Sequence, residues 1–503
     1  MKAARVITQL LPKQFSRCTS SLTPSLINTQ YAGGTTEPST PQSHGRRKLS
    51  TSIAVSKDMK KSSDYSTAAR ELPQLEVPNY DRELKFKGLE TDFPCLSRLP
   101  TAGPDATYQK VTTGFKEYHH KEPFSVKYNE GILPELTIAY ETFGTLNEDK
   151  SNAVIIFCGL SASSHIRSHK DNPAPGWWEK FVGPGCAVDT NEFFVICCNN
   201  LAGCYGTTGP SSINPTTGQP YGTTFPIISV DDIVHSQFLL LDHFGIDKVY
   251  ATVGSSLGGM TSLLSPALYP DRVGRAICIS CCAQTHPTSI SLRYLQRRAI
   301  MTDPNWARGH YYGESYPRMG MKLAREIATI TYRSGPEWGN RFGRKRTHNN
   351  ASPSLCPYFE IEEYIEYQGE SFSTKFDPNS LLYISKAMDL FDMSEGYSSL
   401  LEGVSRVKCP VMIIGVQTDI LIPCWQQKEI ADLLKKSGNT AVTYYELDSL
   451  YGHDTFLLDL SNVGSAVKGQ LETKLTQTGI VRKQKPQWLA EDAERKVSQQ
   501  PAS

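Results

Sequence analysis

The pattern that most constrains this chain is the run G-S-S-L-G-G at 254–259, which lies between an apolar run at 248–253 and a helix-like segment at 260–269. Gly254 and Gly258 permit a tight, strained turn between a strand and a helix, and such a turn presents the hydroxyl of Ser256 above the edge of a sheet. A Gly/Ser loop can match this pattern by chance. The flanking strand and helix nevertheless favour Ser256 as a nucleophile.

Two downstream residues supply the partners that a nucleophilic serine needs. Asp419 follows the apolar run 411–416, and His453 follows the last strand-like run, 443–447. Alone, each is typical of an ordinary turn or loop. The order Ser256, Asp419, His453, however, is the order of the catalytic triad in α/β-hydrolases. We predict that Ser256 attacks, His453 takes and returns the proton, and Asp419 orients the histidine.

The oxyanion hole of such a site needs two backbone N–H groups. We expect one from Leu257, which follows the nucleophile, and one from Leu160, in the loop after the apolar run 153–158. His165 lies in the same loop, and we interpret it as a loop residue without a direct catalytic role.

Apolar runs alternate with helix-like segments through most of the chain. Continuous apolar runs of this kind are typical of a mostly parallel sheet covered by helices on both faces. We therefore predict an α/β-hydrolase fold. The expected strands are 110–115 and 136–143, which open the sheet antiparallel, and then 153–158, 193–198, 249–253, 276–281, 411–416 and 443–447. The expected helices include 231–244, 260–269, 321–330, 381–389 and 426–436.

The interval 286–401 breaks this alternation and is rich in Arg and Tyr, so we predict that it forms a helical lid inserted into the core. The core would comprise 101–285 and 402–480. Residues 37–100 resemble a low-complexity linker, and 481–503 a solvated tail. A lid of this size also offers a surface for a homodimer.

Residues 1–36 contain four basic residues and no Asp or Glu, and they are rich in Ser and Thr. A basic, hydroxyl-rich, acid-free N-terminus is typical of a mitochondrial transit peptide. The predicted location is the mitochondrial matrix; an untargeted tail, and hence the cytoplasm, is the alternative.

Charge and cysteine usage exclude several other classes. With 52 basic and 51 acidic residues, the chain has no excess charge for nucleic acid or an anionic membrane surface. Cys278 and Cys281 form one C-x-x-C, but neither a second pair nor a histidine spacing completes a zinc site. We expect no metal and no cofactor.

Beyond the triad, the stretch from about 110 to 460 resembles the homoserine O-acetyltransferase family, whose members are α/β-hydrolase-fold acyltransferases. The motifs that carry the resemblance are NLAGCYGTTGPSS at 200–212, FPIISVDD at 225–232, the elbow, YISKAMD at 383–389 and GHD at 452–454. The resemblance implies transfer of an acyl group from acyl-CoA to the serine and then to an amino-acid hydroxyl. It also implies that Arg325 binds the carboxylate of the acceptor and Asp454 its amino group.

Two departures from the acetyltransferase pattern are similar to the serine O-succinyltransferases and fungal mitochondrial serine acyltransferases. Arg293 stands where many homoserine acetyltransferases have Asn, and the loop Ser161, Ala162, Ser163, Ser164 replaces the usual Thr-Gly form. An arginine beside the acyl pocket would suit the distal carboxylate of a succinyl group. An arginine on the lid surface is the alternative interpretation of Arg293.

The resemblance therefore implies a serine O-succinyltransferase that acts in cysteine or methionine biosynthesis, with L-serine and succinyl-CoA as substrates. Acetyl-CoA with L-serine or L-homoserine is the second interpretation. An esterase or thioesterase, in which water takes the acyl group, is a more distant third.

Overall fold

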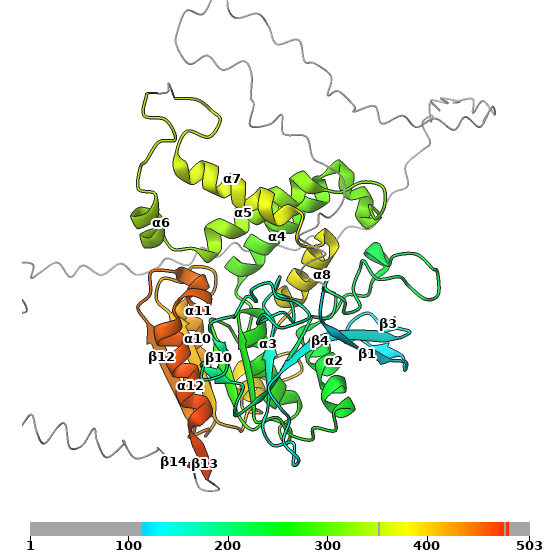
Figure 1. Ribbon diagram of the computed structural model, residues 1–503, viewed down its shortest axis with the longest axis vertical. Helices are drawn as coiled ribbons and strands as arrows, with labels where there is room; N and C mark the ends of the chain where they lie inside the picture. The colour runs from blue at the N-terminus through cyan, green and yellow to red at the C-terminus, as the bar shows by residue number, and fades with distance from the viewer. Residues whose placement is uncertain (1–112, 351–352, 477–478, 482–503) are drawn as a thin grey trace, which may run out of the picture. The chain divides into compact units, whose positions relative to one another are not determined.

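The computed structural model describes residues 113–350, 353–476 and 479–481 (Figure 1). The sequence predictions for 1–36, 37–100, 101–112 and 482–503 lie outside these residues. The centre is an eight-stranded sheet in the order β1-β4-β8-β5-β9-β10-β11-β12. The strands are β1 (Lys116–His120), β4 (Leu136–Phe143), β5 (Ala153–Phe157), β8 (Phe194–Cys198), β9 (Ala251–Ser255), β10 (Ala276–Ile279), β11 (Val411–Val416) and β12 (Val442–Leu447). The strand β4 pairs antiparallel with β1 and β8, and the other neighbours are parallel.

Both faces of this sheet are buried, which explains why its strands are continuous apolar runs. In β5, Ile155 and Phe157 pack into one hydrophobic cluster, whereas Val154 and Ile156 pack into another on the opposite face. The first cluster includes residues of α2 (Val230–His243), α3 (Leu257–Leu268) and α10 (Cys424–Lys436). The second includes α12 (Ser465–Glu472) and the segment 166–188. The predicted α/β-hydrolase architecture is confirmed.

Helices α4 (Pro287–Thr302), α5 (Arg318–Tyr332), α6 (Gly335–Arg341), α7 (Glu360–Ser373) and α8 (Pro378–Asp389) all fall within the predicted insertion. They gather at one end of the core (Figure 1), and α5 packs against both α4 and α7. Asp377 shows why α8 begins where it does: its side chain accepts the N–H of Ser380, and Pro378 occupies the first turn.

The remaining elements are short. They are β2 (Phe124–Ser125), β3 (Ile132–Leu133), β6 (Val182–Gly183), β7 (Val188–Asp189), β13 (Lys474–Thr476), β14 (Gly479–Val481), η3 (Gly222–Thr224), η4 (Pro304–Gly309), α9 (Leu400–Val404), η5 (Gly452–Asp454), α11 (Thr455–Leu458) and η6 (Leu460–Gly464). In the described part of the chain, no helix is both long and apolar enough to span a bilayer.

The predicted opening strand at 110–115 is wrong, because the described part of it, 113–115, is not a strand. Gly114 has a φ of +80°, a left-handed conformation that breaks an extended chain, and β1 begins only at Lys116. The predicted strand 249–253 is also displaced. Val249 makes only an isolated bridge, whereas Ser255 pairs with Ile279, so β9 runs up to the elbow.

Candidate active site

Ser256 occupies the strained turn that the sequence predicts. It follows β9 directly and precedes α3, with φ +57° and ψ −122°, a conformation that L-residues rarely adopt. Gly254 and Gly258 are required because a Cβ at 254 would lie 2.0 Å from the carbonyl oxygen of Gly258, and a Cβ at 258 would lie 2.2 Å from that of Phe157. The elbow is therefore packed directly against β5.

Asp419 and His453 meet beside this elbow. His453 Nδ1 lies 2.7 Å from Asp419 Oδ2, while Asp419 Oδ1 accepts the N–H groups of Leu421 and Ile422, each at 2.9 Å. The carboxylate is thus fixed on both oxygens and orients the imidazole. His453 Nε2 is buried and has no hydrogen-bond partner among the described residues, and both His453 and Ser256 line one cavity.

The surroundings of His453 favour its protonated form. Burial of the ring opposes protonation, but the Asp419 carboxylate and its hydrogen bond outweigh burial, and Asp454 adds to their effect. Together they raise the pKa of His453 above its ordinary value, while the nearby Arg293 guanidinium lowers it. An imidazolium formed during proton transfer is therefore stabilised.

The cavity has a volume of about 300 Å³ and lies between the core and the lid. Core loops contribute Gly159, Leu160, Ser161, Ala162, Trp177, Ser256, Leu421, His453, Asp454, Phe456 and Leu457. The lid contributes Arg293, Gln296, Ala324, Arg325, Ala328, Thr331, Tyr332, Phe372, Leu381 and Met388. The lining is mostly apolar with a few charged groups, as is typical of small-molecule sites.

The two residues predicted for the oxyanion hole lie on the expected elements. Leu160 lines the cavity in the loop after β5. Leu257 is the first residue of α3, so its N–H lies in the first turn, where no helical carbonyl precedes it. A developing oxyanion above Ser256 would face the N-terminus of α3.

The structure brings Arg325 and Asp454 to the same cavity. The Arg325 guanidinium lies over Phe372 (4.2 Å) and Tyr332 (4.8 Å), and its Nε is buried without a hydrogen-bond partner among the described residues. Asp454 Oδ2 lies 3.3 Å from Arg333 Nε. Burial raises the pKa of Asp454 despite this cation. A fixed cation and a fixed anion thus face one space.

Arg293 also lines the cavity, so it is not on the lid surface. Its Nε lies 2.6 Å from Asp389 Oδ1, and Arg297 Nη2 lies 2.5 Å from Asp389 Oδ2. Arg293 Nη2 is buried and has no hydrogen-bond partner among the described residues. Two guanidinium groups share one carboxylate, so this cluster carries one net positive charge. Asp389 is the last residue of the motif YISKAMD at 383–389, and nothing in the sequence spacing indicates its pairing with Arg293 and Arg297.

The loop predicted for substrate specificity divides into two parts. Ser161 and Ala162 line the cavity, whereas Ser163 and Ser164 are not among its lining residues. The Ser163 carbonyl accepts the indole N–H of Trp177, and the Ser164 hydroxyl donates to a buried glutamate, Glu141. Ser163 and Ser164 therefore anchor the loop.

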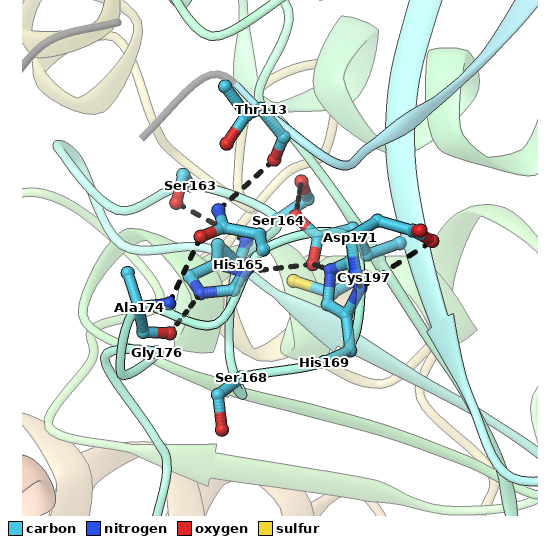
Figure 2. A network of polar contacts seen from close by, with 12 residues as sticks. Thr113, Ser163, Ser164, His165, Ser168, His169, Asp171, Ala174, Gly176 and Cys197 are labelled. Carbon is cyan, nitrogen blue, oxygen red and sulfur yellow. Dashed lines mark hydrogen bonds and ion pairs between the residues drawn. The ribbon is translucent and has the colours of Figure 1, made fainter. Parts of the chain in front are cut away.

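Figure 2 shows the polar network behind this loop, which includes Ser164, His165 and His169. Glu141 Oε2 lies 3.0 Å from His165 Nδ1 and 2.8 Å from His169 Nε2, and His165 Nε2 lies 2.7 Å from the Ala174 carbonyl. Burial opposes protonation of His165, but Glu141 and the carbonyl raise its pKa overall. His165 is not among the residues that line the cavity.

The same three side chains, Glu141, His165 and His169, have the ligand types of a metal site, with ligand atoms within 4.8 Å of one another. Hydrogen bonds nevertheless close the network. His169 Nδ1 accepts the N–H of Asp171 at 3.3 Å, which places the proton of a neutral ring on Nε2, facing Glu141. The geometry thus favours hydrogen bonds between these three side chains over coordination of a metal ion.

Comparison with known proteins agrees with this geometry. Residues 152–465 match the model of the alpha/beta hydrolase fold family. The chain is 48% identical to a serine O-succinyltransferase of Schizosaccharomyces pombe, over 74% of this chain and 86% of the relative. It is 44% identical to a homoserine O-acetyltransferase of Moorella thermoacetica, over 67% of this chain and 90% of the relative.

Two solved structures are similar. One is a homoserine O-acetyltransferase from Bacillus anthracis (TM-score 0.68, 30% identity, 72% of this chain and 99% of that chain). The other is esterase E22 (TM-score 0.66, 28% identity, 72% of this chain and 100% of that chain). The resemblance identified from the sequence is confirmed. The chain belongs to the family of homoserine O-acetyltransferases and serine O-succinyltransferases, which are O-acyltransferases of the α/β-hydrolase fold.

Proposed function

We propose that this protein transfers the succinyl group of succinyl-CoA to the hydroxyl of L-serine through an acyl intermediate on Ser256. The observation that carries the choice of donor is the Arg293 guanidinium, which lines the same cavity as Ser256 and has a buried, unpartnered Nη2. The similarity to the serine O-succinyltransferase of Schizosaccharomyces pombe supports the same acceptor and donor.

In the first half-reaction, His453 takes the proton of Ser256 as the Ser256 Oγ attacks the thioester carbonyl. The N–H groups of Leu160 and Leu257 stabilise the resulting oxyanion. The C–S bond then breaks, and His453 returns the proton to the CoA sulfur. The result is a succinyl ester on Ser256 and free CoA.

In the second half-reaction, the acceptor hydroxyl replaces CoA. Arg325 holds the acceptor carboxylate, and Asp454 holds its ammonium group. His453 takes the hydroxyl proton, the acceptor oxygen attacks the ester carbonyl, and the bond to Ser256 Oγ breaks as that oxygen regains the proton. The product is an O-acylated amino acid whose acyloxy group is a good leaving group, suited to displacement by a sulfur nucleophile.

The charge of the Arg293–Asp389–Arg297 cluster favours a donor with a carboxylate. A succinyl carboxylate that enters the cavity loses water, and its burial is costly unless a charged partner replaces that water. One unit of positive charge remains in the cluster after Asp389 is paired, and Arg293 Nη2 is free to donate. An acetyl group has no charge for this cation to pair with.

The experiment that tests the proposal is a two-by-two assay. Purified protein is incubated with L-serine or L-homoserine, each with succinyl-CoA or acetyl-CoA, and the products are identified by mass. We expect O-succinylserine to form with the highest kcat/KM. Ser256→Ala is the control for uncatalysed transfer. A clear preference for acetyl-CoA would refute the succinyl assignment and leave the second interpretation, an O-acetyltransferase for serine or homoserine.

The similarity to esterase E22 makes hydrolysis a specific alternative. The same triad would release free succinate if water reached the acyl-enzyme. Repeating the assay without an amino acid separates the cases, because an esterase or thioesterase gives free acid at a rate that the amino acid does not change. We expect added L-serine to divert the acyl group from water.

We further propose that residues 1–36 direct the protein to the mitochondrial matrix, because a cationic, acid-free segment can form the amphipathic helix that import requires. A fluorescent reporter fused to 1–36 should accumulate in mitochondria. A diffuse cytoplasmic signal would contradict the proposal.

We also propose that the reaction needs no cofactor and no metal, so that a chelator leaves the rate unchanged.

A homodimer through the lid is part of the proposal. Leu295 on α4 and Leu323 and Ile330 on α5 are exposed apolar side chains on the lid. Exposed apolar patches are typical of protein interfaces. Light scattering after size exclusion should give twice the monomer mass for the wild type. The Leu323→Asp variant should give the mass of a single monomer.

A further inference from the structure

The segment that joins α5 to α6 rests directly on the loop that carries His453 and Asp454. The Ser334 hydroxyl donates to the Leu450 carbonyl. Gly452 has a φ of +60°, and a Cβ there would lie 3.0 to 3.1 Å from backbone atoms of residues 332–334. A side chain at 452 is thus disfavoured on two grounds, the backbone conformation and the tight space. The lid and the loop that carries His453 are therefore in direct contact through these residues.

A chain of three charges runs through the same contact. Arg333 Nε lies 3.3 Å from Asp454 Oδ2, and Arg333 Nη1 lies 2.9 Å from Glu337 Oε1. The side chains of all three are mostly buried, and Glu337 Oε2 has no hydrogen-bond partner among the described residues. Glu337 is held in place from α6, where its N–H donates to Ser334 Oγ at 3.1 Å.

The sum of these charges is one negative unit. A direct Asp454–Arg333 pair alone would be neutral, and Arg333 would then compete with any ammonium group for Asp454. Glu337 also forms an ion pair with the Arg333 guanidinium. One unit of negative charge therefore remains beside the cavity, where Asp454 is part of the lining. Without Arg333, in contrast, two buried carboxylates would face each other, and one of them would tend to take up a proton.

The ionisation of Asp454 depends on groups from every element packed against it. Burial raises its pKa most; Arg333, His453 and Arg325 lower it, in that order, and Glu337 raises it. An uncharged Asp454 has no charge with which to hold an ammonium group. Among the charged groups around Asp454, Arg333 therefore contributes most to keeping it ionised.

We propose that Arg333 is a positioning residue for the amino-acid acceptor: it holds Asp454 in place as a carboxylate, and Glu337 moderates this hold so that Asp454 stays available to the acceptor's ammonium group. The inference rests on the proposed function, in which Asp454 receives that group. Arg333 itself is not among the residues that line the cavity and touches no reacting atom.

The test compares Arg333→Gln, Arg333→Lys and Glu337→Gln in the full-length protein. Both glutamine variants should raise KM for L-serine, by roughly 10-fold or more for Arg333→Gln. Their pH profiles should differ in direction. For Arg333→Gln, loss of the cation raises the Asp454 pKa, so the acid limb of kcat/KM for L-serine moves to higher pH. For Glu337→Gln, loss of the anion lowers that pKa, so the limb moves to lower pH.

Single-turnover acylation by succinyl-CoA alone is the internal control. Both substitutions reach His453 only through Asp454, whose effect on the His453 pKa is smaller than those of burial and of Asp419, so the acid limb of acylation should move less than the limb of transfer in both variants. Arg333→Lys keeps the charge and should restore most of the wild-type limb. If Arg333→Gln fails to fold, Arg333→Lys and Glu337→Gln still test the proposal.

The outcomes separate the two proposals. If the wild type is acylated but passes the group to no amino acid, the proposed function is wrong, and the role of Arg333 falls with it. If the wild type transfers to L-serine but the two glutamine variants move the acid limb in the same direction, or leave it unmoved, only the inference is overturned. Equal losses in acylation and transfer would also overturn it, because they would indicate a structural role.

Discussion

Two charge clusters of opposite composition lie beside the cavity, and each contributes one residue to its lining, Arg293 or Asp454. On one side, two arginines, Arg293 and Arg297, share Asp389; on the other, two acids, Asp454 and Glu337, share Arg333. The first cluster carries one net positive charge and the second one net negative charge. An isolated buried ion is costly, whereas a paired one leaves nothing for a ligand. In a cluster of three charged groups, two charges cancel and one remains unpaired. The remaining charge is opposite in sign to the substrate group that the cluster is proposed to bind.

The triad and the Arg293–Asp389–Arg297 cluster come from different parts of the chain. Ser256, Asp419 and His453 all lie on core loops that follow strands of the main sheet. Arg293, Arg297 and Asp389 all lie on lid helices. In the proposed mechanism, the reacting groups therefore come from the core, and most of the binding groups come from the insertion. Variants in the three groups should therefore fail in three distinguishable ways.

The largest effect should come from Ser256→Ala, which removes the group that both half-reactions need. We expect transfer to fall on the order of 10³-fold or more, because no acyl-enzyme can form. Intact-mass spectrometry after incubation with acyl-CoA should show the acyl adduct on the wild type only. An adduct on another residue of the variant would contradict the assignment.

The meeting of Asp419 and His453 beside the Ser256 elbow could be predicted from the sequence, because each residue follows a strand at a position that the fold dictates. Ser256, Asp419 and His453 each come after an apolar run, and the parallel sheet brings those strand ends to one edge. The sheet itself was predictable for the same reason, since both of its faces are buried and its strands are apolar throughout. The errors lie at strand ends such as β1, where the φ of Gly114 decides the boundary.

The charge clusters were only half predictable. The resemblance singled out Arg293 and Asp454, but their partners are set by packing between elements. Asp389 lies 96 residues from Arg293 and Arg333 lies on a different element from Asp454, so no local spacing connects them. The contact of Glu141 with His165 and His169 has the same origin. Pairings of this kind follow from the tertiary structure.

The next largest effect should come from the acceptor side. Arg325→Ala should lower kcat/KM for L-serine by roughly 100-fold, because a guanidinium can grip a carboxylate with two charge-assisted hydrogen bonds. Acylation by acyl-CoA, measured by rapid quench, should stay within a few-fold of the wild type. Arg344→Ala is a matched control, since Arg344 is an exposed lid arginine over an aromatic ring. If Arg325→Ala loses acylation as severely as Ser256→Ala, the clamp interpretation fails.

A smaller effect is expected on the donor side. Arg293→Asn should lower kcat/KM for succinyl-CoA about 10-fold and spare acetyl-CoA, because one buried nitrogen, Nη2, is free for the succinyl carboxylate. Arg298→Asn is the matched control, since Arg298 lies on the same helix but is exposed and stacks on Tyr294. Equal losses with both donors would mean that Arg293 only holds the lid together through Asp389.

The smallest effect should be on the pKa of His453, which Arg293 of the lid influences. The Arg293 guanidinium lowers the pKa of His453, whereas Asp419 raises it above the ordinary imidazole value of about 6.5. His453 must be neutral to act as a base, so acylation is lost as the pH falls through this pKa. Removal of the cation in Arg293→Asn raises the pKa of His453 further, and the acid limb of acylation should therefore move to higher pH. The profile is best measured with acetyl-CoA in single turnovers, because that donor lacks the carboxylate whose binding the same substitution weakens. Arg298→Asn should leave the limb in place. A limb that stays put or moves to lower pH in Arg293→Asn would show that the donor cluster and the triad are electrostatically independent, and that the lid affects recognition alone.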